Sequence, residues 1–135
     1  MLRKLLILLS LIVICFAAWV RLAPTDPARW HVLPQDAAPG NRPGGALRRI
    51  GGDTATFARL AALIADTPRT TRIAGDTASG MITFETRSRG FAFPDYTTIR
   101  LDADGITLYG RLRYGLSDLG VNAARIDGWL DALAQ

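Results

Sequence analysis

Arginine is the residue type in this sequence best placed to do chemistry, because four arginines fall on predicted neighbouring strands among tyrosines and threonines. A guanidinium group binds a carboxylate or a phosphate through paired hydrogen bonds. Arginines on adjacent strands repel one another unless acidic side chains pair with them or an anion lies among them. The candidate ligand-binding residues are Arg87, Arg100, Arg111, Arg113 and Asp118. The acids available for pairing are Glu85, Asp95 and Asp118, and we expect Asp118 to lie beside Arg111 or Arg113.

Patterns for catalysis and metal binding are sparse. His31 is the single histidine, and no serine lies in the Gly-x-Ser-x-Gly sequence that exposes a hydrolase nucleophile. The single cysteine, Cys15, lies in an apolar run, so histidine and cysteine cannot together form a transition-metal site. Asp102 and Asp104 flank a predicted hairpin turn, where aspartate is common for backbone reasons. We therefore predict no catalytic residue, no metal and no cofactor.

The charge balance argues against nucleic acid as a partner. Removing Arg3 and Lys4, which precede the apolar run, from the 16 basic residues leaves 14 against 12 acidic residues. A surface that binds nucleic acid is normally a strongly basic stripe. The soluble part of this chain is close to neutral instead.

Two helices and a sheet must position the arginines. Apolar residues at spacings of three and four predict a helix that Asp53 caps and Pro68 ends, and a second helix over residues 123–133 that Asn122 caps. Between and before them, alternating residues predict strands over 46–50, 70–74, 81–88, 96–101 and 106–113. The Asp104 and Gly105 pair predicts a tight hairpin between the last two strands. The fold class is α+β, with an antiparallel sheet of about four to five strands and two helices on one face.

Alternation also assigns the two faces of the sheet. Residues such as Ile82, Phe84 and Ile99 share one parity, which should face the helices. The opposite parity carries the arginines together with Tyr96 and Tyr109. One face should therefore be apolar and the other rich in arginine and tyrosine.

The N-terminal segment, residues 1–22, is predicted to be one transmembrane helix. Leu5 to Val20 contains no charged residue and would extend about 24 Å as a helix, against a hydrocarbon core of about 30 Å. A cleaved secretory signal is the alternative, but the residues around Ala17 and Ala18 do not supply small side chains at both positions that cleavage needs. Residues 23–45 hold five of the seven prolines and form a Pro/Gly-rich linker, and residues 46–135 form the α+β domain.

The positive charges predict the orientation. Arg3, Lys4 and the amino terminus outweigh Arg21, which places the N-terminus in the cytoplasm. The expected location is the cytoplasmic (inner) membrane, with a single pass and the C-terminal domain in the periplasm. The alternative is secretion to the periplasm after cleavage.

Two blocks of sequence resemble a known family. They are residues 109–122 followed by Arg125, and Thr86–Arg89 followed by Phe93, Pro94 and Asp95. In this order they are similar to the domain of unknown function 1499 family, and residues 21–31 resemble its membrane-anchored proteobacterial members. The resemblance covers most of residues 46–135. It implies a single α+β module in a cell envelope and carries over no catalytic residue.

We therefore expect a membrane-anchored envelope protein that is a non-enzymatic binding or structural module. Its Arg/Tyr face would bind an envelope protein, an anionic lipid headgroup or another anion. The alternative is an enzyme of unrecognised type acting on an anionic envelope substrate, with Ser117 and Asp118 beside the arginines.

Overall fold

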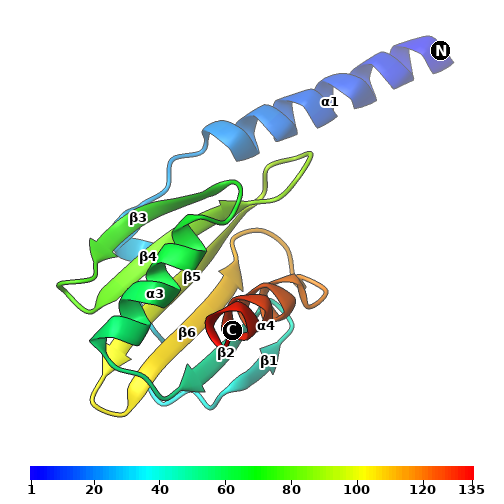
Figure 1. Ribbon diagram of the computed structural model, residues 1–135. Helices are drawn as coiled ribbons and strands as arrows, with labels where there is room; N and C mark the ends of the chain where they lie inside the picture. Colours follow the sequence, from blue (N-terminus) through cyan, green and yellow to red (C-terminus); the bar gives the residue numbers. More distant parts are fainter.

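The computed structural model describes residues 1–135 and has an α+β fold (Figure 1). Six strands form one antiparallel sheet in the order β1-β2-β6-β5-β4-β3. The strands are β1 (Gly40–Arg42), β2 (Gly45–Ile50), β3 (Thr70–Asp76), β4 (Met81–Arg87), β5 (Pro94–Asp102) and β6 (Gly105–Leu112). The helices are α1 (Leu2–Leu22), α2 (Pro27–Trp30), α3 (Thr54–Ala65) and α4 (Val121–Leu133). The predicted class is confirmed, with one or two strands more than expected.

Helix α3 begins and buries itself as the sequence predicts. The Asp53 carboxylate accepts a hydrogen bond from the Thr56 backbone N–H, which caps the first turn. The apolar stripe at spacings of three and four is entirely buried, and consists of Phe57, Leu60, Ala61 and Ile64. This stripe lies on the sheet and is a large part of the core.

Helix α4 begins two residues earlier than predicted, and Asn122 is not its N-cap. The Asp118 carboxylate instead accepts hydrogen bonds from the Gly120 and Asn122 backbone N–H groups, at 3.0 and 2.9 Å. The Asn122 side chain is fully buried and also donates to Asp118, at 2.8 Å. Capping by an aspartate three residues before the helix therefore replaces the predicted cap.

The hairpin between β5 and β6 is confirmed, with Asp102 opposite Gly105 across a two-residue turn. The turn residues are Ala103 and Asp104, and Gly105 has a φ of 121°, where a side chain would meet the Ile50 carbonyl. Strand β1 lies within the proline-rich segment and was not predicted. It is only three residues long and pairs with β2 at the edge of the sheet.

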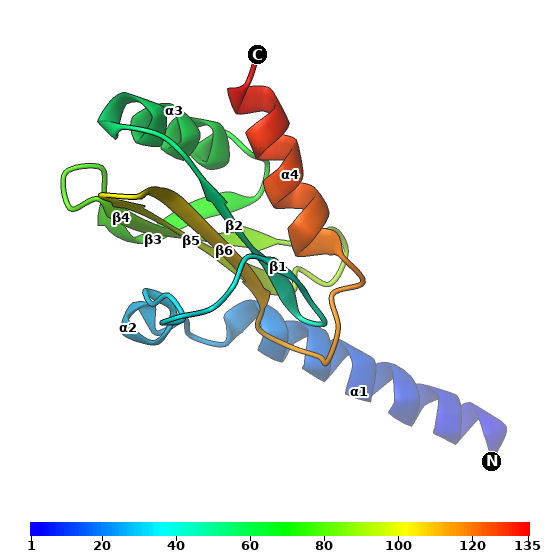
Figure 2. The same cartoon turned by 90° about the horizontal axis from the view of Figure 1, so that it is seen from below.

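The core lies between the sheet and the helix pair α3 and α4, as the alternation predicts. Its sheet residues include Ile82, Phe84, Ile99, Ile106 and Leu108. Figure 2 shows α3 and α4 on one side of the sheet, and α2 with the segment around it on the other. The second face is therefore covered as well, by residues that follow α1.

Helix α1 projects from one end of the domain (Figures 1 and 2). It is the one helix long and apolar enough to cross a membrane, by length and composition. Most of its apolar side chains are exposed, whereas Val20, near its end, is fully buried against the domain.

Candidate anion-binding groove

The arginine and tyrosine face of the sheet holds the segment that follows α1. Arg87 forms an ion pair with Glu85, with 2.6 Å between Nε and Oε1. The other oxygen of Glu85 accepts a hydrogen bond from the Thr25 hydroxyl at 2.7 Å. Glu85 is buried, so these partners offset the cost of removing its carboxylate from water.

Arg113 fastens the same segment. Its guanidinium donates to the Tyr96 hydroxyl at 3.1 Å and to the Pro24 carbonyl at 3.0 Å. Tyr96 is fully buried, and its hydroxyl lies 3.0 Å from that of Thr25. Arg87 and Arg113 therefore act mainly within the chain, on the residues just beyond α1.

Arg111 is the most deeply buried of the predicted site arginines. Its guanidinium donates to the Thr98 hydroxyl at 3.0 Å, to the Tyr109 carbonyl at 3.2 Å and to the Trp30 carbonyl. It lies over the rings of Tyr109 and Trp30, at 4.7 and 5.6 Å from their centroids. Burial lowers the pKa of Arg111 to about 10, so the group is still a cation at neutral pH.

A groove of about 550 Å³ opens beside Arg111, between the segment after α2 and strands β1, β2 and β6. Its lining is Arg29, Trp30, Val32, Leu33, Pro34, Arg42, Gly44, Gly45, Tyr109, Arg111 and Leu112. Three of these residues are arginines and none is acidic. No carboxylate lies within 4.0 Å of any of the three guanidinium groups, since the four ion pairs of the protein involve other arginines. The groove thus combines positive charge with aromatic and apolar walls.

Comparison with known families gives one result. The family described as "Protein of unknown function (DUF1499)" matches residues 26–133. The chain belongs to this family. The resemblance seen in the sequence is thereby confirmed, and the matched range includes α2 and β1 as part of the DUF1499 domain. A comparison with curated proteins found no match.

Of the five predicted site residues of this DUF1499 chain, the groove contains Arg111 alone. Arg100 pairs with Asp102 on the surface, with 2.9 Å between Nε and Oδ2. Asp118 forms no ion pair, so the expected pair with Arg111 or Arg113 is wrong. The reason is local: the free N–H groups at the start of α4 use both carboxylate oxygens.

The structure instead pairs Asp95 with Arg125, at 3.2 Å between Oδ2 and Nη1. Burial raises the pKa of the Asp95 carboxyl, against the opposing effect of Arg125. Arg125 also donates to the Asn122 side chain at 3.1 Å. This pair joins β5 to α4 beneath the Arg/Tyr face.

Arg29 and Arg42 are groove residues that the sequence did not single out. Both lie in the proline-rich segment predicted to be a linker, and only the folding of that segment over the sheet brings them to Arg111. Trp30 and Val32 were the one indication in the sequence that this segment packs on the domain, because they are too aromatic and apolar for a simple spacer. Arg42 has one hydrogen bond, to the Ala38 carbonyl at 3.1 Å.

The other residues considered for chemistry lie apart. The His31 ring contacts the Thr83 hydroxyl at 2.9 Å and helps to hold α2 on the sheet. Ser117 accepts a hydrogen bond from the Leu119 N–H at 3.2 Å, in the loop before α4. No group of three histidine, cysteine, aspartate or glutamate side chains is arranged to hold a metal ion.

Proposed function

We propose that this chain is a single-pass protein of the cytoplasmic membrane whose DUF1499 domain lies in the periplasm and binds an anion as a non-enzymatic module. The anchor is α1, and the charges of Arg3 and Lys4 favour a cytoplasmic N-terminus. The ligand site is the groove around Arg111. The observation that carries the proposal is the presence of three arginines without an acidic residue in one groove.

The groove favours a particular class of anion. Arginine binds phosphate and carboxylate groups with more than one N–H donor. The walls formed by Trp30, Leu33 and Leu112 are apolar and suit an attached hydrocarbon group. The proposed ligand is therefore a phosphate or carboxylate that carries an apolar substituent, such as an anionic lipid headgroup with part of its chain.

A binding experiment tests this with the full chain in nanodiscs of neutral lipid. The probes are inorganic phosphate, dihexanoyl phosphatidic acid and, as the neutral comparison, dihexanoyl phosphatidylcholine, each titrated by calorimetry. We expect phosphatidic acid to bind more tightly than either of the others. Tighter binding of inorganic phosphate would indicate a free anion as the ligand, and absence of binding by both anions would contradict the proposal.

Charge-removing variants locate the site. Arg42→Gln should weaken phosphatidic acid binding roughly tenfold, because one charge-assisted hydrogen bond contributes about 1.5 kcal/mol or more. Arg59→Gln is the matched control, since Arg59 lies on α3, on the other side of the sheet, and is exposed. Equal effects of the two variants would show a general response to net charge and would count against the groove.

A further inference from the structure

The loops beside the end of α1 carry apolar side chains that the fold leaves in solvent. Leu116 and Leu119 are 94% and 92% exposed, and Phe91 is 48% exposed. They lie in the loop between β4 and β5 and in the loop between β6 and α4. Burying such side chains is favourable, so an exposed group of them on one end of a domain marks a contact surface.

Aromatic contacts fix these loops to the last turns of α1. The Phe16 and Phe93 ring centroids are 6.1 Å apart, and those of Trp19 and Tyr114 are 5.4 Å apart. Phe91 continues the cluster, at 5.7 Å from Phe93. The loops therefore lie alongside the part of α1 that begins at Phe16.

A hydrogen bond adds to this attachment. The Arg21 guanidinium donates to the Gly90 carbonyl at 2.6 Å. Because Arg21 follows the apolar run directly, the bond holds the tip of the β4 to β5 loop at the level where α1 leaves the hydrocarbon. Arg89 lies next to Gly90 and is exposed, so a positive charge borders the apolar group.

The length of α1 then determines where the loops lie. From Leu5 to Cys15, before the first contact with the domain, the apolar part of the helix extends only about 16 Å. A hydrocarbon core is about 30 Å thick. A domain held wholly in water would leave about half of that core unspanned. The helix fits the bilayer much better if the turns from Phe16 onward, with the loops attached to them, enter the membrane surface.

We propose that the loops 88–93 and 113–120 form a second membrane contact, which inserts Phe91, Leu116 and Leu119 into the outer leaflet beside α1. This rests on the proposed function, because it requires α1 to be in the bilayer. The aromatic cluster suits the interfacial region, where tryptophan and tyrosine collect. The exposed Arg89 suits anionic headgroups. The contact would fix the orientation of the domain on the membrane.

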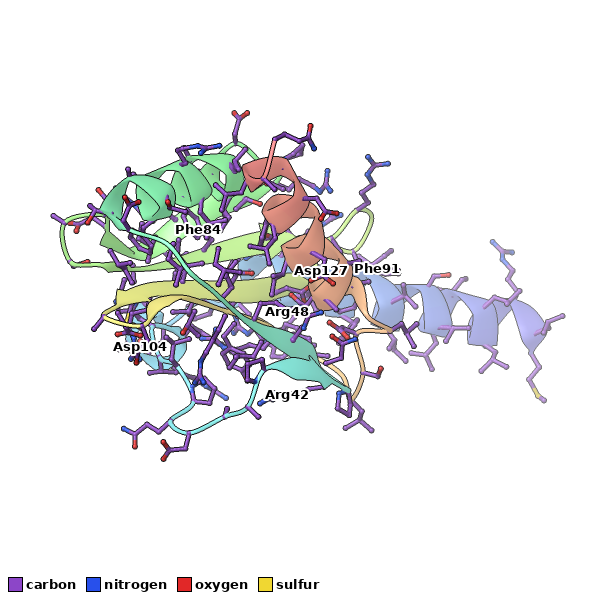
Figure 3. All side chains as sticks on the ribbon, turned by 60° about the horizontal axis from the view of Figure 1, so that its bottom comes forward. Arg42, Arg48, Phe84, Phe91, Asp104 and Asp127 are labelled. Carbon is purple, nitrogen blue, oxygen red and sulfur yellow. The ribbon has the colours of Figure 1, made fainter.

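Figure 3 shows Phe91 at the end of the domain from which α1 projects and Asp104 at the opposite end. Labels on the loops at the α1 end can therefore be compared with a label at the opposite end. Single cysteines are placed at Leu116, Leu119 or Asp104 in a Cys15→Ser background, which removes the only native thiol. Each is labelled with the same environment-sensitive fluorophore, and the full chain is reconstituted in vesicles of phosphatidylethanolamine and phosphatidylglycerol. A label at Ile12 reports on the anchor itself.

Quenching by a nitroxide on the lipid is compared with quenching by aqueous iodide. We expect severalfold stronger nitroxide quenching at 116 and 119 than at 104, and the reverse order for iodide. If Ile12 is in lipid while 116 and 119 behave like 104, the loop contact is overturned and the anchor stands. If Ile12 is itself reached by iodide, both proposals fail. Labels shielded only in native membranes and not in vesicles would assign the surface to a protein partner and also overturn the lipid contact.

Discussion

Trp30 stacks its indole ring on the phenol ring of Tyr96, with ring centroids 4.0 Å apart and an interplanar angle of 20°. The carbonyl group of Trp30 also accepts hydrogen bonds from Arg111 and from the Thr98 hydroxyl. One residue of the proline-rich segment thus covers the sheet and completes the wall of the groove. The segment after α1 is therefore part of the folded domain.

Trp30→Ala removes the stacked ring and loosens the segment from the sheet. We expect the free energy of unfolding to fall by about 3 kcal/mol, at the low end for aromatic residues because Trp30 is only half-buried. The measurement is guanidinium unfolding of the full chain in detergent, followed by circular dichroism. Val32→Ala is the control in the same segment, since Val32 is 48% exposed, and its effect should be below about 1 kcal/mol.

Arg111→Lys keeps a positive charge but loses the planar fork that reaches Thr98 and the Trp30 carbonyl together. We expect a loss of about 1–2 kcal/mol in unfolding free energy, because at least one buried acceptor is left without its donor. Arg100→Lys, at a surface ion pair, should change stability by less than about 0.5 kcal/mol. Equal stability of the two variants in the same unfolding assay would contradict the role assigned to Arg111.

The sequence alone was sufficient to predict the elements in which a periodic apolar pattern extends over many residues. Twelve residues of α3 contain a complete apolar stripe from Phe57 to Ile64, and one parity of β4 to β6 faces it. Asp53 as a helix cap was also predictable, because its partner Thr56 is three residues away. Residues close together in the sequence determine these patterns and this cap, so they can be predicted from a single sequence.

The groove could not be predicted in the same way, because contacts between distant residues create it. Arg29 and Arg42 meet Arg111 only after the proline-rich segment folds across the sheet. Strand β1 has three residues beside Pro43, too short for a periodic pattern. The Asp118 carboxylate could either cap a helix or pair with an arginine. In the structure it accepts hydrogen bonds from the nearby N–H groups at the start of α4 and does not pair with the more distant arginines.

Gly45→Ala should disrupt the pairing of β2 with β6. A Cβ at this position would lie 2.1 Å from the Gly110 carbonyl oxygen and 3.1 Å from the Arg111 Cα, which are backbone atoms that cannot move aside. We expect a loss of roughly 1–3 kcal/mol in unfolding free energy together with weaker binding in the groove. Gly51→Ala is the matched control, because nothing lies within 4 Å of the added carbon. If the two variants melt at the same temperature, the close approach of β2 and β6 is wrong.

The orientation of the chain can be tested with the native cell envelope. In the proposed orientation, the charges of Arg3 and Lys4 keep the N-terminus in the cytoplasm. Protease added to intact spheroplasts should then digest the C-terminal domain and leave a membrane-bound fragment of α1. A tag at residue 135 should become accessible and one at residue 1 should not. Protection of the C-terminal tag, or recovery of the intact chain from the cytosol, would contradict the periplasmic placement.

Asp118 should make the stability of the domain depend on pH in acid. Desolvation is the largest single influence on its carboxyl and raises the pKa. Hydrogen bonds from Asn122 and Gly120 lower the pKa, and together they outweigh desolvation, so the pKa lies below its ordinary value. A carboxyl with a lower pKa in the folded state stabilises the fold above its unfolded pKa, near 4, and loses that contribution as the pH falls through the folded value.

Asp118→Ala should therefore lower the free energy of unfolding by about 1 kcal/mol at pH 7, through loss of the cap at α4. The difference from the unaltered chain should shrink as the pH is lowered from 5 towards 2. Asp131→Ala provides the comparison, since Asp131 lies exposed on the same helix and its carboxylate accepts no hydrogen bond. The measurement is thermal unfolding of both variants and the unaltered chain across this pH range. If the stability difference between Asp118→Ala and the unaltered chain stays constant, the effect of the substitution does not come from loss of the ionised cap.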